Sequence, residues 1–512
     1  MSSGFDIDTP YTWGYYNELS PIYLNFVCAL NGHHPIPLDD GFSYCELGCG
    51  YGVTTNGLAE LFPQGDFIGI DYNDDHIDAA NEMAEEIGSL NVDFKSLDFN
   101  EISKADLPQF DFIVLHGVYS WVDPNTREAI RKFIAAHLKE DGIAYVSYDC
   151  MPGWAAIAPL RDIVLTHTAG MTTSSQMKAQ AGLDYLDFMA NNNASFFVDN
   201  PPAKEFLNEI KGRDIDYVTH ELLVDFAKPY YFHQVAAEMR SAGLSYSGSA
   251  ILNLNLIDLA VPAEFHEILQ NASSRNEFES RGDFIRNQRF RKDVFKNSRK
   301  TMDVEEQLEV LSHVVFGVTC AVPEFKTSVA FGDVSLNYAG DVFSSLIDVL
   351  SVSAKSAASL SEMDQFKEYP LELIVDALKF LSAGKQVVPM RADAEGRTDL
   401  DLDADRYTIP AAFNIQFLKR RLLKQSEMVL LAPRAGVGIE MSMADALFAL
   451  CMVEATRDEV APWVFQRLVE AKQEIIFAGG TEQEAIAEAV EKFRETRLPK
   501  FLELGILEPA QD

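Results

Sequence analysis

Long hydrophobic runs are absent from this chain of 512 residues. No stretch approaches the ~20 consecutive apolar residues that a membrane-spanning helix needs. The first residues, Met1 to Asp8, are acidic and carry no basic stretch ahead of an apolar one, so we expect no secretory signal. Both absences lead us to expect a cytoplasmic protein without a membrane span.

Cysteine is scarce and scattered along the chain. The six cysteines lie at positions 28, 45, 49, 150, 320 and 451. None of them forms a Cys-x-x-Cys pair, the spacing that many zinc sites use. We therefore expect no metal, and we interpret the cysteines as free thiols in a reducing compartment rather than as disulfides.

Basic residues are in short supply. The chain has 42 Lys and Arg against 78 Asp and Glu, so its formal net charge is −36. A phosphate backbone would be repelled, which argues against general nucleic-acid binding. The charge is compatible with a cationic substrate or partner, and equally with nothing more than a soluble acidic surface.

One cluster runs against this overall charge. Its basic residues are Arg286, Arg289, Arg291, Lys292, Lys296, Arg299 and Lys300. A neighbouring module that resembles a winged helix keeps nucleic-acid binding open as an alternative. We favour a solvated strand edge or an interdomain salt-bridge surface, because the rest of the chain is acidic.

The chain is long enough for several domains. Hydrophobic residues make up 47% of the sequence and aromatic residues 11%, which is enough for more than one core. From residue 40 to 150, apolar runs of strand length alternate with helical patterns. We expect strands over 42–47, 66–71, 92–97, 110–116 and 143–148, and helices over 53–62, 76–87 and 126–138. This alternation predicts an α/β fold with a parallel sheet and ligand sites at the C-terminal ends of the strands.

The turn after the first expected strand is rich in glycine. Gly48, Gly50 and Gly52 stand at alternate positions after Glu46, and Asp71 ends the next expected strand. Glycine has no Cβ, so a ligand can come close to the backbone. An acidic residue in this place can accept hydrogen bonds from both hydroxyls of a ribose. The form Glu-x-Gly-x-Gly-x-Gly differs from the dinucleotide form and resembles motif I of the class I S-adenosylmethionine (AdoMet)-dependent methyltransferases.

That motif gives each residue of the region an expected part in binding AdoMet. The three glycines would bring the backbone to the methionine and ribose parts, and Glu46 would orient the turn from beneath. Asp98, after the third expected strand, would accept a hydrogen bond from the adenine amino group, with Phe99 beside the ring. Another nucleotide-binding α/β protein is the alternative for the glycine turn, and a helix cap is the alternative for Asp98.

The ends of the fourth and fifth strands offer candidates for catalysis. They are His116, Tyr119, Trp121, Tyr148, Asp149 and Trp154. The Asn- or Asp-Pro-Pro-aromatic tetrapeptide typical of methyltransferases that act on amide or nucleobase nitrogen is absent after strand four. Aromatic faces can hold a cationic amine, and desolvation can lower the pKa of a lysine acceptor. His116 can instead be the base for a hydroxyl acceptor, and core packing is the alternative for Tyr119 and Trp121.

Residues 151–230 break the alternation of strands and helices. They are helix-prone and carry Asn-rich and Asn-Pro-Pro loop signals, so we expect a helical insertion that caps the catalytic sheet. An independent helical domain is the alternative. The alternation then returns over 231–300, with a helix over 232–242, a strand over 244–252 and a final strand within 284–296.

The remainder of the chain has a different character. We expect helices over 304–318, 341–353, 371–381 and 482–493, a hairpin over 325–338 and a strand over 385–390. Helices around a short hairpin suggest a winged-helix-like module over 301–395. An acidic linker over 392–405 leads into a mainly helical C-terminal domain over 396–512.

The first forty residues are expected to form a cap segment. Pro10 to Glu18 are dense in aromatic residues, which is unusual because chain termini are commonly plain unless they are tied down. We expect this segment, over 1–40, to fold over the cofactor. A simple packing strap is the alternative.

Several segments together resemble one bacterial group. They are Tyr15 to Leu19, Glu46 to Gly52, His116 to Val122, Tyr145 to Trp154 and a block from Tyr217 to Asn297. The group is the class I methyltransferases with a methyltransferase regulatory domain. Its best understood members are the rickettsial protein lysine methyltransferases that modify an outer-membrane protein. Where that group carries Asn-Thr after the tyrosine of strand five, this chain has Asp149-Cys150.

The resemblance implies a Rossmann-like class I methyltransferase sheet with S-adenosyl-L-methionine as cofactor. The cofactor site that it implies consists of Gly48, Gly50, Asp71, Asp98 and His116. It also implies methyl transfer to lysine side chains of a protein by in-line displacement, with the C-terminal modules helping to hold that protein. A small-molecule or surface-glycan methyltransferase and a non-catalytic AdoMet-sensing protein stay open as alternatives.

Overall fold

The structure is a computed structural model that describes residues 13–224, 226–319, 325–394, 400–402, 404–424, 427–456, 459–470 and 482–510. The segments Met1 to Asp8 and Pro10 to Thr12, Cys320 and part of the acidic linker lie outside these residues. The described cysteines are buried free thiols. Among the described helices, none is both long enough and apolar enough to cross a membrane.

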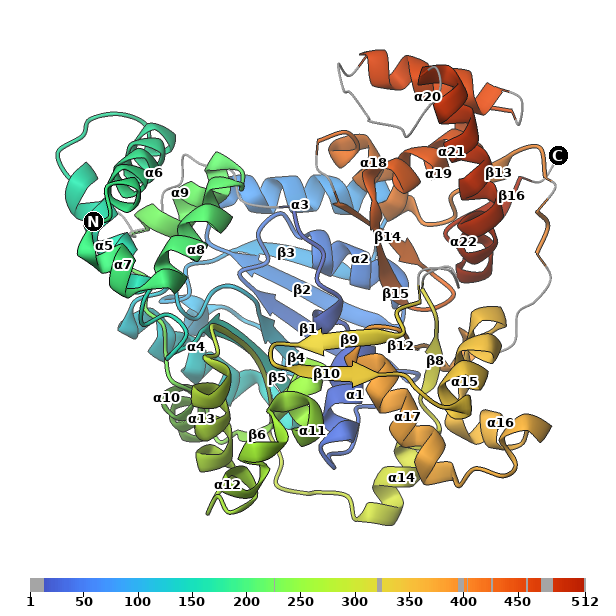
Figure 1. Cartoon of the computed structure of the whole chain (residues 1–512), viewed down its shortest axis with the longest axis horizontal. Helices are drawn as coiled ribbons and strands as arrows, with labels where there is room; N and C mark the ends of the chain where they lie inside the picture. The colour runs from blue at the N-terminus through green and yellow to red at the C-terminus, as the bar shows by residue number, and fades with distance from the viewer. Residues whose placement is uncertain are drawn as a thin grey trace.

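A seven-stranded sheet forms the centre of the molecule (Figure 1). Its strands are β1 (Phe42–Leu47), β2 (Gly65–Asp71), β3 (Val92–Ser96), β4 (Phe110–Leu115), β5 (Leu138–Asp149), β6 (Ser245–Ser249) and β7 (Phe290–Lys296). Their spatial order is β3-β2-β1-β4-β5-β7-β6. Strands β1 to β5 run parallel, and β7 runs antiparallel to both of its neighbours. The predicted α/β fold with a Rossmann-like sheet is confirmed.

Helices cover both faces of this sheet. One face carries α1 (Pro21–Leu30), α2 (Val53–Leu61) and α3 (Asp74–Ile87), and the other carries α4 (Pro124–His137) and α10 (Phe232–Ser241). Adjacent residues of β1 point to opposite faces, as a strand requires. Tyr44 packs in one core with Leu58 of α2, whereas Cys45 packs in the other core with Ile130 of α4.

Two of these helices begin earlier than the hydrophobic pattern predicts. The side chain of Asn73 accepts the backbone N–H groups of Asp75 and His76 and caps α3. Asp123 accepts those of Asn125 and Thr126 and caps α4. Both caps lie in polar sequence, where a pattern of apolar residues gives no information.

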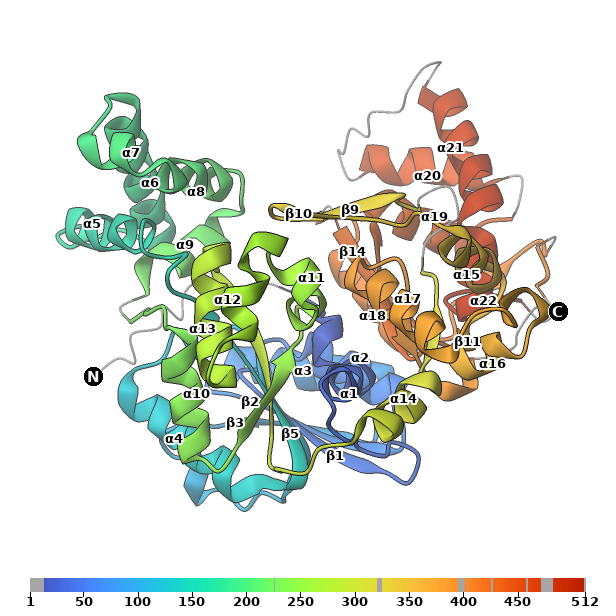
Figure 2. The same cartoon turned by 60° about the horizontal axis from the view of Figure 1, so that its bottom comes forward.

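Helices α5 to α9 form a lobe beside the sheet, which we call the insertion lobe (Figure 2). The helices are α5 (Ala158–Thr168), α6 (Ser175–Asn191), α7 (Ser195–Asp199), α8 (Pro201–Lys211) and α9 (Ile215–Leu223). They bury a cluster of their own, which includes Leu183, Phe206 and Leu222. Between α10 and β7, the chain forms β6, α11 (Ile257–Ala260), α12 (His266–Gln270) and α13 (Arg275–Arg286).

The region after β7 differs from its sequence prediction. The helix expected over 304–318 is wrong in its second half, because α14 (Val304–Ser312) ends early and β8 (Val315–Gly317) follows. Val315 and Phe316 are buried there as a strand between β11 and β12. The elements that follow are β9 (Ser328–Phe331), β10 (Val334–Asn337), α15 (Asp341–Val352), β11 (Lys355–Ser356), α16 (Ala357–Ser361), α17 (Leu371–Ala383) and β12 (Val388–Met390). The hairpin β9–β10 is a separate sheet, so the winged-helix-like module stays a prediction.

The rest of the chain forms a C-terminal lobe. It consists of β13 (Tyr407–Thr408), α18 (Ala412–Arg421), β14 (Glu427–Ala432), β15 (Val437–Ser442), α19 (Met443–Glu454), α20 (Val460–Glu470), α21 (Glu482–Thr496), α22 (Leu498–Leu504) and β16 (Glu508–Pro509). The sequence did not predict the hairpin β14–β15, which turns at Gly436 with φ +73°. The carboxylate of Glu60 in α2 accepts the N–H groups of Ala412 and Phe413 at 2.6 and 2.7 Å and joins this lobe to the sheet.

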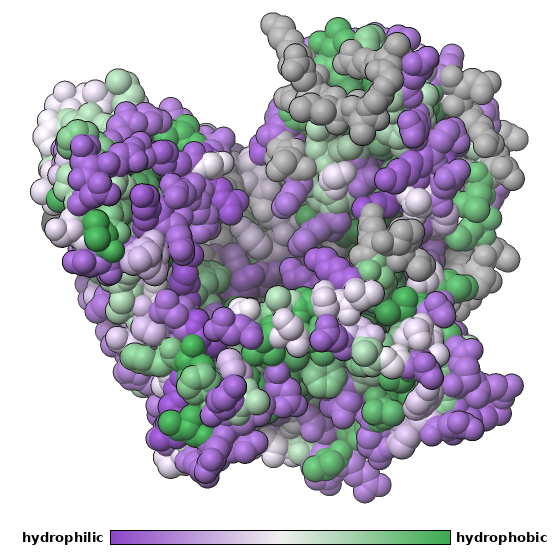
Figure 3. Space-filling view, viewed as in Figure 1, coloured by the Kyte–Doolittle hydropathy of each residue, from purple (hydrophilic) through white to green (hydrophobic). Residues whose placement is uncertain are grey.

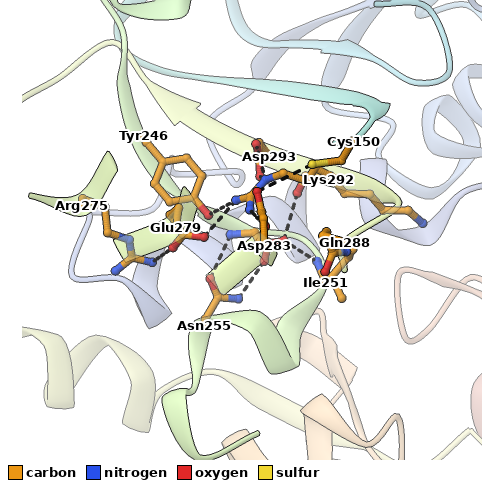
Figure 4. Close-up of polar contacts among 12 residues, drawn as sticks. Cys150, Tyr246, Ile251, Asn255, Arg275, Glu279, Asp283, Gln288, Lys292 and Asp293 are labelled. Atoms are coloured by element: carbon orange, nitrogen blue, oxygen red, sulfur yellow. Dashed lines mark hydrogen bonds and ion pairs between the residues drawn. The ribbon is translucent and has the colours of Figure 1, made fainter. Parts of the chain in front are cut away.

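The basic cluster of the sequence is not an exposed patch. Arg291 on β7 is fully buried and contacts three carboxylates. Figure 4 labels the residues that carry them. Its guanidinium lies 2.6 Å from Asp283 and 3.0 Å from Glu279, both on α13, and 2.9 Å from Asp293. Of the other members, Lys292 pairs with Glu18. Arg291 and Lys296 are buried and Arg286 and Lys292 are half-buried, whereas Arg289, Arg299 and Lys300 are exposed. The cluster is thus no continuous basic surface.

This buried ion cluster also reaches β5. The hydroxyl of Tyr148 donates to Asp293 at 2.6 Å, and the thiol of Cys150 lies 3.6 Å from Asp283. Burial raises the pKa of Asp293 to about 6, and the charge of Arg291 opposes this rise. Glu279 also pairs with Arg275 at 2.8 Å and Asp283 with Arg286 at 3.0 Å, whereas the ion pair of Asp293 is with Arg291. Arg291 is therefore the positive charge that the three buried carboxylates have in common.

We expect the variant Arg291→Met to lose about 3–5 kcal/mol of unfolding free energy, because it removes the ion-pair partner of the buried Asp293 and one of two partners from Glu279 and Asp283. Urea unfolding followed by circular dichroism measures this loss. Arg299→Met is the matched control, since Arg299 is exposed in the same segment, and its change should stay within about 0.5 kcal/mol. Equal stability of the two variants would contradict a central part for Arg291.

Candidate active site

A cavity of about 870 Å³ lies at the C-terminal ends of the parallel strands. It is lined by residues that end or follow five strands: Gly48, Asp71, Asp98, His116 and Asp149. Helices α8 and α9 supply another part of its wall. These helices border a mostly hydrophilic hollow that lies between the insertion lobe and the C-terminal lobe (Figure 3).

The glycine turn forms one end of the cavity. Gly48 and Gly50 line it, and both adopt left-handed backbone angles, with φ +76° and +52°. Gly52 lies behind the turn instead. A Cβ there would come within 2.6 Å of Phe94 and 2.7 Å of Ala80, so this glycine allows α2 to pack closely on its neighbours rather than a ligand to approach.

Asp71 has the capacity that a ribose would need. Its carboxylate lines the cavity and accepts the N–H groups of Gly50 at 2.9 Å and Asn73 at 3.0 Å. An ionised carboxylate has about four acceptor positions, so about two are left for a pair of hydroxyls. The residues present therefore fit the ribose part of AdoMet.

Glu46 supports the turn from inside the protein. It is buried, and its carboxylate accepts a hydrogen bond from Thr55 of α2. Burial raises the pKa of Glu46 to about 7, and the negative charge of Asp71 adds to this rise. Glu46 thus lies beneath the turn, behind the cavity wall.

Asp98 and Phe99 both line the cavity. One carboxylate oxygen of Asp98 accepts the N–H of Asn100 at 2.8 Å and its side-chain amide at 3.1 Å. Asp98 therefore shapes its own turn, in the manner of a cap. Its second oxygen is the one suited to an adenine amino group.

His116 lines the cavity in its neutral form. Its Nδ1 lies 2.9 Å from the hydroxyl of Tyr145, and its ring lies against that of Tyr16 at 4.1 Å between centroids. Burial lowers the pKa of His116 to about 4. A group with so low a pKa is a weak general base at neutral pH, which disfavours His116 as the base for a hydroxyl acceptor.

The described part of the aromatic N-terminal segment lies along the glycine turn. Trp13 stacks on Tyr51 at 4.5 Å, and Tyr51 contacts His76 at 4.6 Å. The N–H of Tyr16 donates to Thr54 of α2 at 3.2 Å, and Tyr16 itself lines the cavity. The segment therefore supplies part of the wall at the cofactor end.

Two predicted catalytic residues lie in the core instead of at the cavity. Tyr119 is fully buried and donates its hydroxyl hydrogen bond to Glu238 of α10. Tyr148 is also buried, since its side chain faces Asp293 across the β5–β7 pair. Trp121 does line the cavity, with the guanidinium of Arg161 5.7 Å from its ring. Core packing, the alternative considered for Tyr119, is what the structure displays.

Other residues meet at the far end of the cavity, which we call the acceptor end. They are Trp121, Asp149, Trp154, Phe206, Glu209, Tyr217, Glu221 and Arg289. Four of them come from the insertion lobe and belong to no chemical motif of the sequence: Phe206, Glu209, Tyr217 and Glu221. Only their place in a helix-prone insertion next to the sheet pointed to this part of the molecule.

Comparison with known proteins identifies the family of this chain. Residues 38–183 match the methyltransferase domain family, and residues 214–296 match the family described as a predicted methyltransferase regulatory domain. The protein sll1526 of Synechocystis sp. is 31% identical over 521 residues, which cover 99% of each chain. The chain belongs to the methyltransferases with a regulatory domain. The predicted family is thereby confirmed.

Two further relatives extend the comparison of this methyltransferase. RP028 of Rickettsia prowazekii is 30% identical over 231 residues, which are 44% of this chain and 90% of that protein. The structure of PKMT2 from Rickettsia typhi in complex with AdoHcy has the same fold, with a TM-score of 0.72 at 19% identity, over 97% of this chain and 100% of that chain. The protein is an AdoMet-dependent methyltransferase, as predicted.

We expect Asp71→Asn to weaken AdoHcy binding by about five- to a hundredfold, because the amide has one acceptor oxygen where the carboxylate has two. Calorimetric titration measures the loss. Asp75→Asn is the matched control, since Asp75 is exposed on α3, and its affinity should equal that of the wild type. Wild-type affinity in Asp71→Asn would contradict the placement of the ribose.

The pKa of Glu46 predicts a dependence of stability on pH. Ionising this carboxyl is disfavoured only in the folded state, so the free energy of unfolding should fall as pH rises from about 4.5 to about 7. Glu46→Gln lacks the group and should gain stability relative to the wild type over that range, by up to about 3 kcal/mol. Urea unfolding of both proteins at about pH 5 and about pH 8 measures the difference. If the unfolding free energies of Glu46→Gln and the wild type differed by the same amount at both pH values, the raised pKa of Glu46 would be contradicted. Glu82→Gln, which removes an exposed carboxyl, should show such a constant difference.

Proposed function

We propose that this methyltransferase transfers a methyl group from AdoMet to the amine of lysine side chains in a protein. The observation that carries the proposal is the aromatic wall of the acceptor end. Trp121, Trp154, Phe206 and Tyr217 line it, in the same cavity as the cofactor end. Aromatic faces attract an ammonium group and leave it poorly hydrated.

When bound, AdoMet would supply an electrophilic methyl group on its sulfonium sulfur. An amine would attack that methyl carbon in line, and AdoHcy would be the leaving group. The protein therefore contributes chiefly position and desolvation. Trp154 and Phe206 contact each other edge to face at 5.8 Å, and both are buried, so they form a stable apolar wall. Such a wall lowers the pKa of a lysine amine and increases the fraction that is unprotonated and nucleophilic.

The shape of the molecule supports a macromolecular acceptor. The hollow between the insertion lobe and the C-terminal lobe lies beside helices that line the cavity (Figure 3). We propose that the insertion over 151–230 acts as a lid, and that the modules over 301–395 and 396–512 hold the protein acceptor. The fold shared over its whole length with PKMT2, a protein lysine methyltransferase, is consistent with this division.

The proposal predicts methyl groups on lysine in a generic acceptor. The protein is incubated with AdoMet and poly-L-lysine, and methyl-lysine is identified by mass spectrometry after hydrolysis. Trp121→Ala should lower kcat/KM at least about tenfold, because it removes one aromatic face, and should leave AdoHcy affinity unchanged. Methyl transfer to metabolites or glycans, with none to any lysine in a bacterial extract, would contradict the proposal.

A further inference from the structure

Two carboxylates stand among the aromatic residues of the acceptor end. Asp149 is the last residue of β5 and is 8% exposed, and Glu221 lies on α9. Both line the cavity, and each lies within electrostatic range of the other. The backbone of Asp149 is fixed on both sides, since its N–H donates to Ser120 and its carbonyl accepts from Tyr230, each at 2.8 Å.

The surroundings leave negative charge in excess. Among the described residues, the charged groups that face the pair are Arg161 on α5, Arg289 before β7 and Glu209 on α8. Tyr217 and His220 are further titratable groups on the cavity wall. Three carboxylates thus meet two guanidiniums, and Arg289 is shared with Glu209 at 3.5 Å. Counting carboxylates and guanidiniums alone, this end of the cavity has room for one more positive charge, either a bound proton or a cationic ligand.

We propose that Asp149 and Glu221 form the amine site of this methyltransferase, which binds the ammonium group of the acceptor and takes its proton before methyl transfer. The inference rests on the proposed function and names the residues of that same site. An ammonium group between the two carboxylates and the aromatic wall would supply such a positive charge.

Proton and methyl transfer need the carboxylate pair, the acceptor amine, AdoMet and water. The ammonium gives one proton to a carboxylate of the pair, which leaves a neutral amine and a carboxylic acid. The nitrogen lone pair then forms the new N–C bond, while the C–S bond breaks and its electron pair stays on sulfur as a neutral thioether. The product is a methylammonium, and the carboxylic acid returns its proton to water through the cavity opening.

The raised pKa values of Asp149 and Glu221 agree with a role in accepting the proton of the ammonium group. Burial raises the pKa of Glu221 to about 7 and that of Asp149 well above its ordinary range, and the charges of Arg161 and Arg289 limit both rises. Two neighbouring carboxyls titrate as a unit, and the raised pKa of both favours a shared proton on the empty pair. An arriving ammonium group would displace that proton, and binding would release it to the buffer.

The first experiment uses n-butylamine as a probe for the end of a lysine side chain. It is titrated calorimetrically into the full-length protein saturated with AdoHcy, at neutral pH, in two buffers with different ionisation enthalpies. The wild type should bind the amine with release of a proton. Asp149→Asn and Glu221→Gln should each bind it at least about tenfold more weakly and release less, because a charged hydrogen-bond partner is lost.

Two controls distinguish amine binding by Asp149 and Glu221 from an effect of the substitutions on the fold. Glu205→Gln removes an exposed carboxylate of α8 outside the cavity and should behave as the wild type. All three variants should keep wild-type affinity for AdoHcy, which reports an intact fold. Butylamine binding and proton release equal to the wild type in both Asp149→Asn and Glu221→Gln would overturn the inference.

A second experiment distinguishes failure of the inference from failure of the proposed function. Methylation of poly-L-lysine is measured against pH in the wild type and in both variants. The acidic limb of kcat/KM should move to lower pH in each variant, because the remaining carboxyl loses its like-charged neighbour. If the wild type methylates lysine and the variants keep its rate and pH profile, the amine site is wrong and the proposed function stands. If no lysine is methylated while butylamine binding still needs both carboxyls, the site stands and the protein acceptor is wrong.

Discussion

The buried guanidinium of Arg291 is the interaction on which the catalytic region depends. It holds the carboxylates of Glu279, Asp283 and Asp293 inside the protein and thereby fastens α13 to β7. Through Tyr148 the same cluster reaches β5, directly before Asp149 enters the cavity. The segment that matches a regulatory domain is therefore no appendage, since it supplies the last two strands of the sheet and fixes the strand that carries the acceptor end.

A second constraint acts at the cofactor end, where three distant parts of the chain meet. The ring of Tyr15 lies between α2 and β15, and a Cβ on Gly57 or Gly438 would come within 2.7 or 2.5 Å of it. The next residue but one, Asn17, exchanges two hydrogen bonds with the backbone of Gly438, each of 2.9 Å. The N-terminal segment is thus held against the glycine turn by the C-terminal lobe. Cofactor binding and the accessory lobe share one wall.

Much of the fold could be predicted because it follows from local sequence patterns. The strands around the glycine turn are short apolar runs, and Asp71 and Asp98 stand where parallel strands end. The acceptor end could not be predicted in the same way, because Phe206 and Glu221 come from helices whose place over the sheet depends on tertiary packing. Tyr119 and Tyr148 lie in the core rather than at the cavity for a related reason. A strand end fixes the position of a residue in the chain but not the side to which its hydroxyl points.

The exchange of hydrogen bonds between Asn17 and Gly438 has a consequence for how such proteins diversify. A new C-terminal lobe grafted onto this catalytic sheet would meet an N-terminal segment shaped for the old one, and the glycine turn would lose its support. The segments around Asn17 and Gly438 would therefore have to change together, although 421 positions separate these two residues. Accessory modules that select different acceptors would be inherited together with a matching N-terminal segment around Asn17, and the sheet between them would stay the same.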